Sequence, residues 1–424
     1  MSKVQKEKIA FVVVRYGLNI NGGAEYHCRM LAERLTDDYE VEVLTTCVQD
    51  YMSGGNVISA EPESINGVLV RRFEVAPVHF VLKGIPRLCV SFTKKLRMFL
   101  YGVNLLSTIN RLFPEWQWFD KLEEKALQNT VFYSPSLNEY IKRHKDEYKA
   151  FIAMTIDYAP FYYTGIYAGE KTIAIPTMHP QKNSFRLHLN KIFARFAYVG
   201  YNSEEERKLG QRVFGNLIKR EGIISVGLED VIPAPWEQTR RKYNLPDEYL
   251  LYVGRVDWYK VTNICSIFLA YKKKYPQSRL KLVMVGSLFL SAVPFAHPDI
   301  VYTGFVSDEE KTAIIQHSIA TVNPSRYESL SLILLESLKQ GKMMLVNGRC
   351  AVLKDHCRKS GYAADYYMNE KQFIRKLHRI VSSEELRNEK STAGKRYVKQ
   401  NYDWDIIMSR LRNAIESVGL KEKQ

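Results

Sequence analysis

Two cations and two carboxylates follow apolar runs in the second half of the chain. Arg255 and Lys260 come after LLYVG, and Glu328 and Glu336 come after IATVNP. A guanidinium and an ammonium suit phosphate oxygens, because one offers a planar fork of donors and the other a compact charge. Carboxylates accept hydrogen bonds from sugar hydroxyls. These residue types therefore indicate a site for a nucleotide-sugar, with the diphosphate on the cations and the two sugar rings on the glutamates.

The segment around the two glutamates is predicted to be an amphipathic helix over about 329–340, ending near Gly341. The first backbone N–H groups of a helix have no partner within it, so they are available to a diphosphate. A capped helix with two exposed glutamates fits the same spacing equally well. The N–H groups predicted to bind the diphosphate are those of Ser329, Leu330, Ser331 and Leu332.

Two further candidates lie in the first half of the chain. Gly22 and Gly23 join a predicted strand to a helix, where small residues let the backbone approach an anion. They form no GxGxxG motif, which argues against an NAD site, and a tight turn explains them equally well. His179 follows the predicted strand 172–177 at the same sheet edge, where it could contact the reacting sugar. A lone histidine more often has a structural role, which is the role expected for His356.

Strand-like and helix-like segments alternate along the chain on both sides of a proline-rich stretch. This pattern predicts an α/β fold with two doubly wound parallel sheets. The expected domains are residues 1–225 and 248–403, with a linker at 226–247 and a last helix, 404–420, packing back on the first domain. Ligands in such folds bind at the carboxyl ends of the strands, so the expected location of the site is a cleft between the two domains.

Composition sets further limits. The 424 residues are 46% hydrophobic and 25% charged, as in ordinary globular proteins, and no run of 18 apolar residues occurs. The six cysteines form no CxxC pair, which favours reduced thiols in a cytoplasmic protein. Asp403-Trp404-Asp405 spells a DxD string, but it opens a predicted helix rather than following a strand. It is rejected as a metal site, so no metal is expected.

Basic charge is concentrated in one segment. The formal net charge is +15, and residues 71–111 hold eight basic residues against one acidic residue. Aromatic residues follow or separate these cations as far as Trp118, a pattern that suits an anionic membrane surface. A solvated helix pair with core aromatics explains the pattern equally well. No nucleic-acid-binding signature accompanies the charge, so nucleic acid is not an expected partner.

Taken together and in order, these motifs resemble glycosyltransferase family 4. The resemblance spans nearly the whole chain and rests on NGGAEYHCRMLAERL, IPTMHP, YVGRVDWYK, VYTGFVSDEEK, NPSRYESLSLILLE and YDWDIIMSRL. It implies a GT-B fold, which consists of two Rossmann-like domains. It also implies a retaining enzyme that uses a nucleotide-diphosphate-sugar and needs no metal.

The resemblance also implies individual roles for the donor-binding residues. Arg255 and Lys260 would bind the donor diphosphate and stabilise the leaving nucleotide. Glu328 would contact hydroxyls of the transferred sugar, and Glu336 would hold the ribose. His179 would hydrogen-bond the donor sugar near its reacting carbon.

In the first domain, the resemblance implies that Gly22 and Gly23 approach the diphosphate. Two departures from the family pattern stand out. Pro180 replaces the acidic residue that often follows the histidine, and serines replace glycines at 329 and 331.

The predicted function is transfer of a sugar onto a glycan or lipid-linked acceptor, in bacterial surface polysaccharide synthesis. The expected location is cytoplasmic, on the inner face of the membrane if segment 71–118 binds lipid. A nucleotide-sugar epimerase can share the fold but needs acid and base carboxylates that the sequence does not supply. A catalytically silent binding subunit is the other alternative, which Pro180 leaves open.

Overall fold

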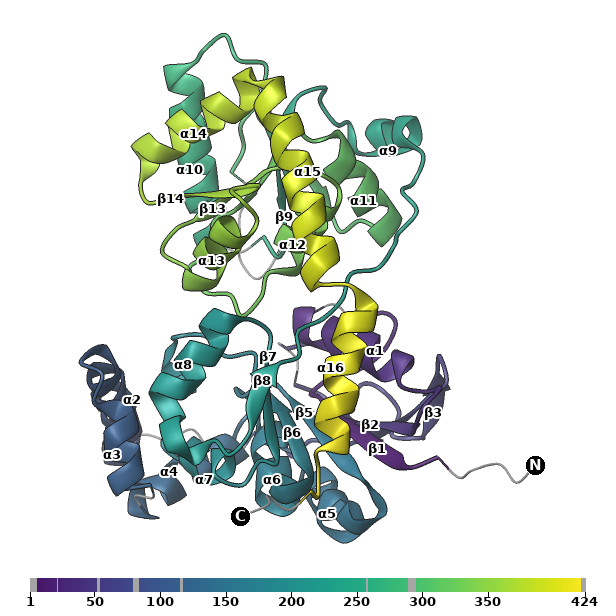
Figure 1. Cartoon of the computed structure of the whole chain (residues 1–424), viewed down its shortest axis with the longest axis vertical. Helices are drawn as coiled ribbons and strands as arrows, with labels where there is room; N and C mark the ends of the chain where they lie inside the picture. The colour runs from purple at the N-terminus through teal and green to yellow at the C-terminus, as the bar shows by residue number, and fades with distance from the viewer. Residues whose placement is uncertain are drawn as a thin grey trace. The chain divides into compact units, whose positions relative to one another are not determined.

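The chain folds into two compact units in the computed structural model (Figure 1). The N-terminal domain comprises Met1–Val226 together with Asp405–Gln424, and the C-terminal domain comprises Gly227–Trp404. The residues that the structure describes are 6–20, 22–51, 54–78, 84–114, 117–256, 258–288 and 295–420, with the backbone alone for 84–86, 117–118 and 258–262.

The N-terminal domain is built on an eight-stranded sheet in the order β3-β4-β2-β1-β5-β6-β7-β8. All neighbouring strands are parallel except β3 and β4, which form a hairpin. Asn66 and Gly67 make its turn with φ of 48° and 83°, as a two-residue type I′ turn requires. The predicted hairpin is thus confirmed. The strands are β1 Lys8–Val12, β2 Glu40–Thr46, β3 Glu63–Ile65, β4 Val68–Phe73, β5 Ala150–Met154, β6 Thr172–Ile175, β7 Tyr198–Tyr201 and β8 Glu221–Ile223.

Helices surround this sheet, and the last helix of the chain is one of them. Glu416 on that helix accepts a hydrogen bond from the Tyr39 hydroxyl at 2.7 Å and pairs with Lys149 at 2.7 Å. The helices are α1 Gly23–Arg34, α2 Gly84–Gly102, α3 Leu106–Leu112, α4 Gln117–Gln128, α5 Pro135–His144, α6 Ala159–Ala168, α7 Leu189–Phe193, α8 Glu204–Phe214 and α16 Trp404–Glu416, with 3-10 turns η1 Lys145–Glu147, η2 Gly169–Lys171, η3 Lys182–Phe185 and η4 Gly215–Leu217.

The C-terminal domain has a six-stranded, fully parallel sheet in the order β11-β10-β9-β12-β13-β14. The order reverses between β9 and β12, and doubly wound sheets bind ligands at the carboxyl ends of the strands beside such a reversal. The strands are β9 Tyr249–Val253, β10 Lys281–Val285, β11 Ile300–Gly304, β12 Ala320–Asn323, β13 Met344–Asn347 and β14 Ala364–Tyr367. The helices are α9 Trp236–Tyr243, α10 Trp258–Lys274, α11 Asp308–His317, α12 Leu332–Lys339, α13 Ala351–Lys359, α14 Glu370–Ser382 and α15 Glu384–Asn401.

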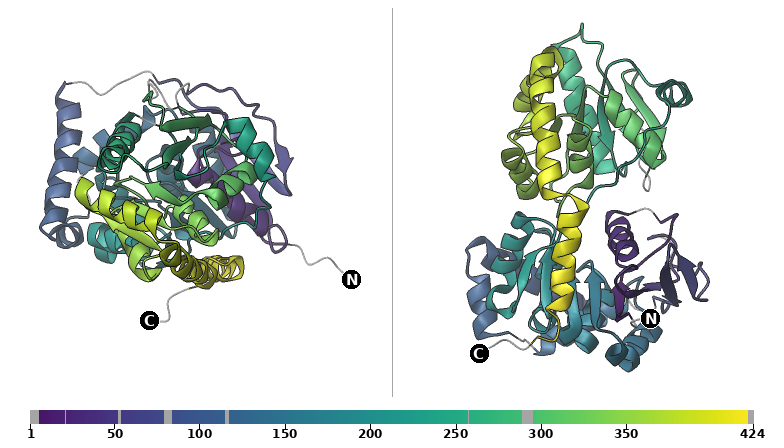
Figure 2. Two further views of the ribbon diagram at one scale, coloured as in Figure 1. Left: turned by 90° about the horizontal axis from the view of Figure 1, so that it is seen from above. Right: turned by 45° about the vertical axis from the view of Figure 1, so that its right-hand side comes forward.

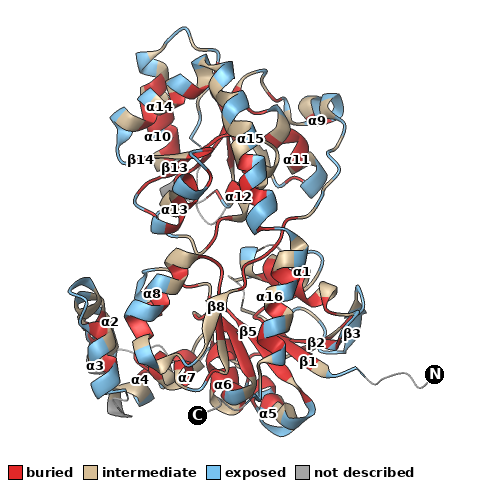
Figure 3. Cartoon of the chain, in the orientation of Figure 1, coloured by how far each residue is buried: buried red, intermediate tan, exposed pale blue. Residues whose placement is uncertain are grey.

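The core of each domain lies on both faces of its sheet. The strands are largely buried (Figure 3), because helices cover both sides of a parallel sheet. On α10, the residues Ile264, Phe268 and Tyr271 are buried at helical spacing. The segment predicted as a linker, 226–247, contains α9. Among the described residues, no helix is both long and apolar enough to cross a bilayer.

Candidate functional site

The loop after β9 carries Arg255, which is exposed. Its backbone is held by the Tyr252 hydroxyl, which donates to the Arg255 carbonyl at 2.7 Å. Gly286, after β10, presses against the same loop, because a Cβ there would overlap the carbonyl oxygen of Gly254. Close packing of the two loops therefore fixes the backbone position of Arg255 at the edge of the sheet. Lys260 lies in the first turn of α10, and its side chain is outside the described residues.

The loop after β12 is organised by Asn323, a buried residue at the end of the strand. Its Nδ2 donates to Glu328 Oε1 at 3.2 Å and to Ser331 Oγ at 3.0 Å. Its Oδ1 accepts from the Ser325 N–H at 2.9 Å. One amide therefore closes the loop and orients the Glu328 carboxylate. Asn323 is not among the residues predicted from the sequence; its signal is a polar residue that ends a buried strand.

The predicted helix at 329–340 begins later than expected. α12 starts at Leu332, and Ser331 precedes it with a left-handed φ of 82°. The N–H groups of residues 329–331 therefore belong to a loop and not to the first helical turn. In the described part of the chain, the N–H groups of Leu330, Ser331 and Leu332 donate to no backbone carbonyl. They remain candidates for binding an anion.

His356 supports this loop from the core. Its Nε2 lies 2.9 Å from the Leu330 carbonyl oxygen and its Nδ1 lies 2.8 Å from the Tyr397 hydroxyl. Burial lowers the pKa of His356 to about 4, so the ring is neutral near pH 7. Since a carbonyl can only accept, Nε2 carries the proton and Nδ1 accepts from Tyr397. His356 thus holds the backbone between Glu328 and α12.

Glu336 is engaged by a cation that was not predicted from the sequence. Lys311 on α11 contacts the Glu336 carboxylate at 3.0 Å and Asp308 at 2.8 Å. Burial opposes the charge on Lys311, but the two carboxylates outweigh it and raise the pKa of the ammonium. A capping box between Ser307 and Glu310 starts α11, and it is the sequence signal that could have placed Lys311.

In the N-terminal domain, Gly22 serves internal packing. It precedes α1, and a Cβ at this position would overlap the carboxylate of Glu25. Glu25 is buried, pairs with Arg15 at 2.8 Å and accepts a hydrogen bond from Tyr51. Gly23 has open space around its Cβ position. Packing against Glu25 therefore accounts for a glycine at position 22, and Gly23 remains available for close approach of a ligand.

His179 lies in the loop after β6 and is half-buried. Its Nε2 lies 2.9 Å from Gln181 Oε1, and its carbonyl accepts from the Ser184 hydroxyl at 2.7 Å. Thr177, two residues earlier, has a φ of 49°, which is rare for a β-branched residue. The ring is therefore presented by a short, strained and internally bonded loop.

Glu206 anchors that loop. Its carboxylate accepts from the Met178 N–H at 2.6 Å and from the Asn202 N–H at 2.7 Å, while Ser203 caps α8 as predicted. The Ser203 side chain accepts from the Glu206 N–H, which is the first half of the predicted capping box, and the Glu206 side chain holds the Asn202 N–H. Burial raises the pKa of Glu206 to about 8. A buried carboxyl therefore ties the start of α8 to the residue before His179.

The predicted site residues fall on two domains. Arg255, Glu328 and Glu336 follow β9 and β12 of the C-terminal domain, on either side of the strand-order reversal. Gly22, Gly23 and His179 lie in the N-terminal domain. Among the described residues, no group of three or more His, Cys, Asp and Glu side chains is placed to hold a metal ion.

Sequence comparisons match the C-terminal half of the chain to a known family. Residues 237–397 match the family described as "Glycosyl transferases group 1". An uncharacterized glycosyltransferase of Methanocaldococcus jannaschii is 24% identical over 432 residues, which cover 97% of this chain and 100% of the relative.

Solved structures align over nearly the whole chain. Sucrose-phosphate synthase from Thermosynechococcus elongatus has a TM-score of 0.65 and 13% identity, covering 97% of this chain and 98% of that chain. The E. coli structure described as "Trehalose-6-phosphate from E. coli bound with UDP-2-fluoro glucose" has a TM-score of 0.65 and 11% identity, covering 96% of this chain and 99% of that chain. Anabaena HepE in complex with UDP and glucose has a TM-score of 0.64 and 12% identity, covering 97% and 100%. The chain therefore has the GT-B fold, and the matches support a glycosyltransferase.

Proposed function

We propose that this protein is a retaining glycosyltransferase of family 4 that moves a sugar from a nucleotide-diphosphate-sugar onto a glycan or lipid-linked acceptor. The observation that carries the proposal lies in the C-terminal domain. Arg255 follows β9 and Glu328 follows β12, the two strands beside the strand-order reversal. The family match over 237–397 includes both residues.

In the proposed mechanism, Arg255 and Lys260 bind the donor diphosphate and stabilise it as it leaves. Stabilisation of developing charge is usually the largest single contribution to catalysis. Glu328, oriented by Asn323, accepts hydrogen bonds from the transferred sugar. Glu336, paired with Lys311, keeps its second oxygen for the ribose. The N–H groups of Leu330, Ser331 and Leu332, which donate to no backbone carbonyl of the described residues, add donors for the phosphate oxygens.

The acceptor hydroxyl attacks from the same face that the diphosphate leaves, and the departing diphosphate takes its proton. This route keeps the anomeric configuration, and the two cations supply the charge neutralisation that a metal ion supplies elsewhere. His179 and the Gly22-Gly23 pair are assigned to the donor sugar and diphosphate on the family resemblance. The Met178 N–H donates to the Glu206 carboxylate, and this bond to the preceding residue supports a fixed position for the His179 ring.

We expect Arg255→Ala to lower turnover by roughly 100-fold, since one charged contact to the leaving group is worth about 3 kcal/mol. The measurement is release of nucleoside diphosphate across a panel of nucleotide-sugars. Arg241→Ala, at an exposed position on α9 of the same domain, is the matched control and should leave turnover unchanged. Wild-type turnover in the Arg255 variant would refute the assigned site.

A membrane-bound acceptor is supported by α2, which turns its apolar side outward. Thr93 and Arg97 are buried, at 2% and 3% exposure, while Leu88, Phe92 and Phe99 are 60–68% exposed. Soluble helices normally show the opposite arrangement. Figure 2 shows α2 at the margin of the N-terminal domain in both views. We therefore assign this face to the cytoplasmic surface of a membrane, where a lipid-linked acceptor of surface polysaccharide synthesis would be presented.

Basic residues accompany that face, though fewer than the sequence suggested. Arg71 pairs with Glu42 at 3.3 Å and Arg72 pairs with Glu63, so these two are structural. Phe80, Lys83, Trp116 and the side chain of Trp118 lie outside the described residues. The exposed cations of the segment in the described residues are Arg87, Lys95 and Arg111.

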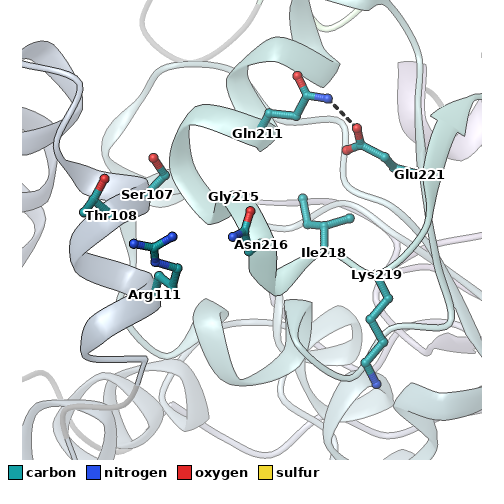
Figure 4. A pocket seen from close by; sticks show the side chains of 9 residues that line it. All are labelled: Ser107, Thr108, Arg111, Gln211, Gly215, Asn216, Ile218, Lys219 and Glu221. Carbon is teal, nitrogen blue, oxygen red and sulfur yellow. Dashed lines mark hydrogen bonds between the residues drawn. The ribbon is translucent and has the colours of Figure 1, made fainter. Parts of the chain in front are cut away.

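Arg111 also lines a cavity of about 540 Å³ between α3 and η4 (Figure 4). Lys219 and Asn216 line it as well, together with Glu221, so the cavity offers hydrogen-bond donors and two basic residues against one acidic residue, next to α3 with its exposed Leu112. That combination suits a phosphate head group at a bilayer surface.

A further inference from the structure

We propose that Lys94 and Arg186 form an anion-binding site in the N-terminal domain, and that its ligand is a phosphate or diphosphate group on the sugar acceptor. The existence of the site is independent of the proposed function. The identity of the ligand as an acceptor rests on that function.

The first observation is that α2 and η3 are bonded together at this point. Arg97 on α2 is buried, and its Nε donates to the Phe185 carbonyl at 3.0 Å. Lys94 lies one helical turn before Arg97 on the same face of α2. Arg186 directly follows Phe185. The hydrogen bond between Arg97 and Phe185 therefore brings the two proposed anion-binding residues, Lys94 and Arg186, to the same junction of α2 and η3.

The second observation is where this junction lies in the fold. Arg186 Nη1 donates to the Asp157 carbonyl at 2.8 Å, in the loop after β5. Arg186 also lies at the end of the segment 176–186, which follows β6 and contains His179. Both loops leave the carboxyl edge of the parallel sheet, where doubly wound folds bind their ligands. The two cations thus share a sheet edge with the histidine assigned to the reacting sugar.

The third observation is that the two cations are half-buried and, among the described residues, have no direct ion-pair partner, although the charges of Glu123 and Asp157 act on both from farther away. In the described part of the chain, neither Lys94 nor Arg186 forms an ion pair with a carboxylate. The nearby Glu123 is engaged by His188, whose Nδ1 and backbone N–H both lie 3.1 Å from its Oε2. Burial and the charge of Arg186 lower the pKa of Lys94 to about 8. A bound anion would give these two cations the direct partner that Glu123 and Asp157 do not supply.

The chemistry of the pair favours a phosphate. A guanidinium presents two parallel donors to phosphate oxygens, and an ammonium adds a compact charge. A phosphate or diphosphate carries negative charge that can pair directly with both cations, whereas a neutral sugar does not. Both proposed binding residues belong to the N-terminal domain, whereas Arg255, assigned to the donor diphosphate, belongs to the C-terminal domain.

The test is calorimetric titration of the full chain with inorganic pyrophosphate. We expect Lys94→Met and Arg186→Gln to weaken binding at least tenfold in an Arg255→Ala background, where the assigned donor site is weakened. Lys95→Met is the matched control: the neighbouring lysine on α2 is exposed and should not affect this binding. Loss of all pyrophosphate binding on Arg255→Ala alone, or equal effects of the Lys94 and Lys95 variants, would overturn the site.

Thermal unfolding provides a second, independent measurement. Removing a half-buried charge that has no direct ion-pair partner among the described residues should leave the Tm of Lys94→Met unchanged or raised, and pyrophosphate should raise the Tm of the wild type more than that of the variant. A lowered Tm in Lys94→Met, with the pyrophosphate effect intact, would show a structural lysine and end the proposal.

Two binding experiments identify the compound that carries the phosphate. One uses phosphatidylcholine vesicles with and without polyprenyl phosphate, and the other uses a soluble hexose phosphate. If Lys94→Met loses binding to only one of them, the site is supported and that compound class is the source of the phosphate. If Lys94→Met binds both as the wild type does, the proposal is contradicted. If no nucleotide-sugar is turned over while Lys94→Met still weakens pyrophosphate binding, the site stands and the transferase assignment fails.

Discussion

Ser331 shows at the residue scale how this chain departs from the glycine-containing pattern of the family that it resembles. A left-handed conformation costs a non-glycine residue roughly 1–2 kcal/mol. The Ser331 hydroxyl offsets part of that cost, because it accepts a hydrogen bond from Asn323 at 3.0 Å. The serine is therefore tolerated at a φ of 82°, in the loop that carries the proposed phosphate-binding N–H groups.

Two substitutions separate these contributions. We expect Ser331→Ala to keep the strain and lose the hydrogen bond, destabilising the C-terminal domain by about 1 kcal/mol. Ser331→Gly loses the bond but relieves the strain, so it should be nearly neutral. Urea unfolding of the three proteins measures the difference. An alanine variant as stable as the glycine variant would show that the backbone is not strained there.

Glu206 predicts a pH dependence of stability. Its pKa is raised from 4.5 to about 8 in the folded chain, so between these values the folded state holds a proton that the unfolded chain has released. Stability therefore falls as pH rises through this window, with a slope of at most about 1.4 kcal/mol per pH unit from this group. Below pH 4.5 and above pH 8 the group adds no slope.

Glu206→Gln removes that titration. The amide places an NH2 against a backbone N–H, which should cost about 1–3 kcal/mol at pH 5. Because only the wild type loses stability on going to pH 8.5, the gap between the two proteins should shrink or reverse. Urea unfolding at both pH values measures it. A gap of constant size would mean that Glu206 is ionised in the folded state throughout.

At the scale of elements, α2 can be tested as a membrane-binding helix. We expect the double variant Phe92→Ser and Phe99→Ser to lose flotation with anionic vesicles while its Tm stays within a few degrees of wild type. Both rings are at least 60% exposed, so the folded core does not depend on them. Lys121→Ser, at an exposed position on α4, is a control. Equal flotation of the variants would remove the membrane assignment.

Elements that depend on local pattern were predictable from sequence. The Asn66-Gly67 turn, the buried strands and the Ser203 cap follow from turn chemistry and periodicity alone. The outward face of α2 was not predictable, since its buried side is polar: Arg97 finds the Asn110 and Asn190 side chains only after folding. The roles of Asn323 and His356 also depend on contacts between elements distant in sequence.

At the scale of the whole molecule, the chain returns to its first domain through α16. Leu411 and Ile415 on this helix are fully buried. The contacts of Glu416, by contrast, involve a side chain that is 58% exposed. Apolar burial therefore holds α16 in place, since exposed ion pairs contribute about 0–1 kcal/mol each.

We expect Leu411→Ala to destabilise the N-terminal domain by about 2–5 kcal/mol, through the cavity it leaves. Glu416→Gln should cost less than about 1 kcal/mol. Differential scanning calorimetry can follow the two domains if they unfold in separate transitions, which loading the C-terminal domain with a nucleoside diphosphate would help to resolve. A Leu411→Ala effect no larger than that of Glu416→Gln would show that α16 is only loosely attached.

The carboxylate lodged against Gly22 has a consequence for any anion that arrives at α1. Glu25 acts as a resident counter-charge at the positive end of the helix dipole, and Arg15 keeps it there at 2.8 Å. An incoming phosphate would meet a helix end that is already partly neutralised. Because Arg15 is itself buried and bonded to Glu25 and the Gln49 carbonyl, its charge is already committed to this internal pair.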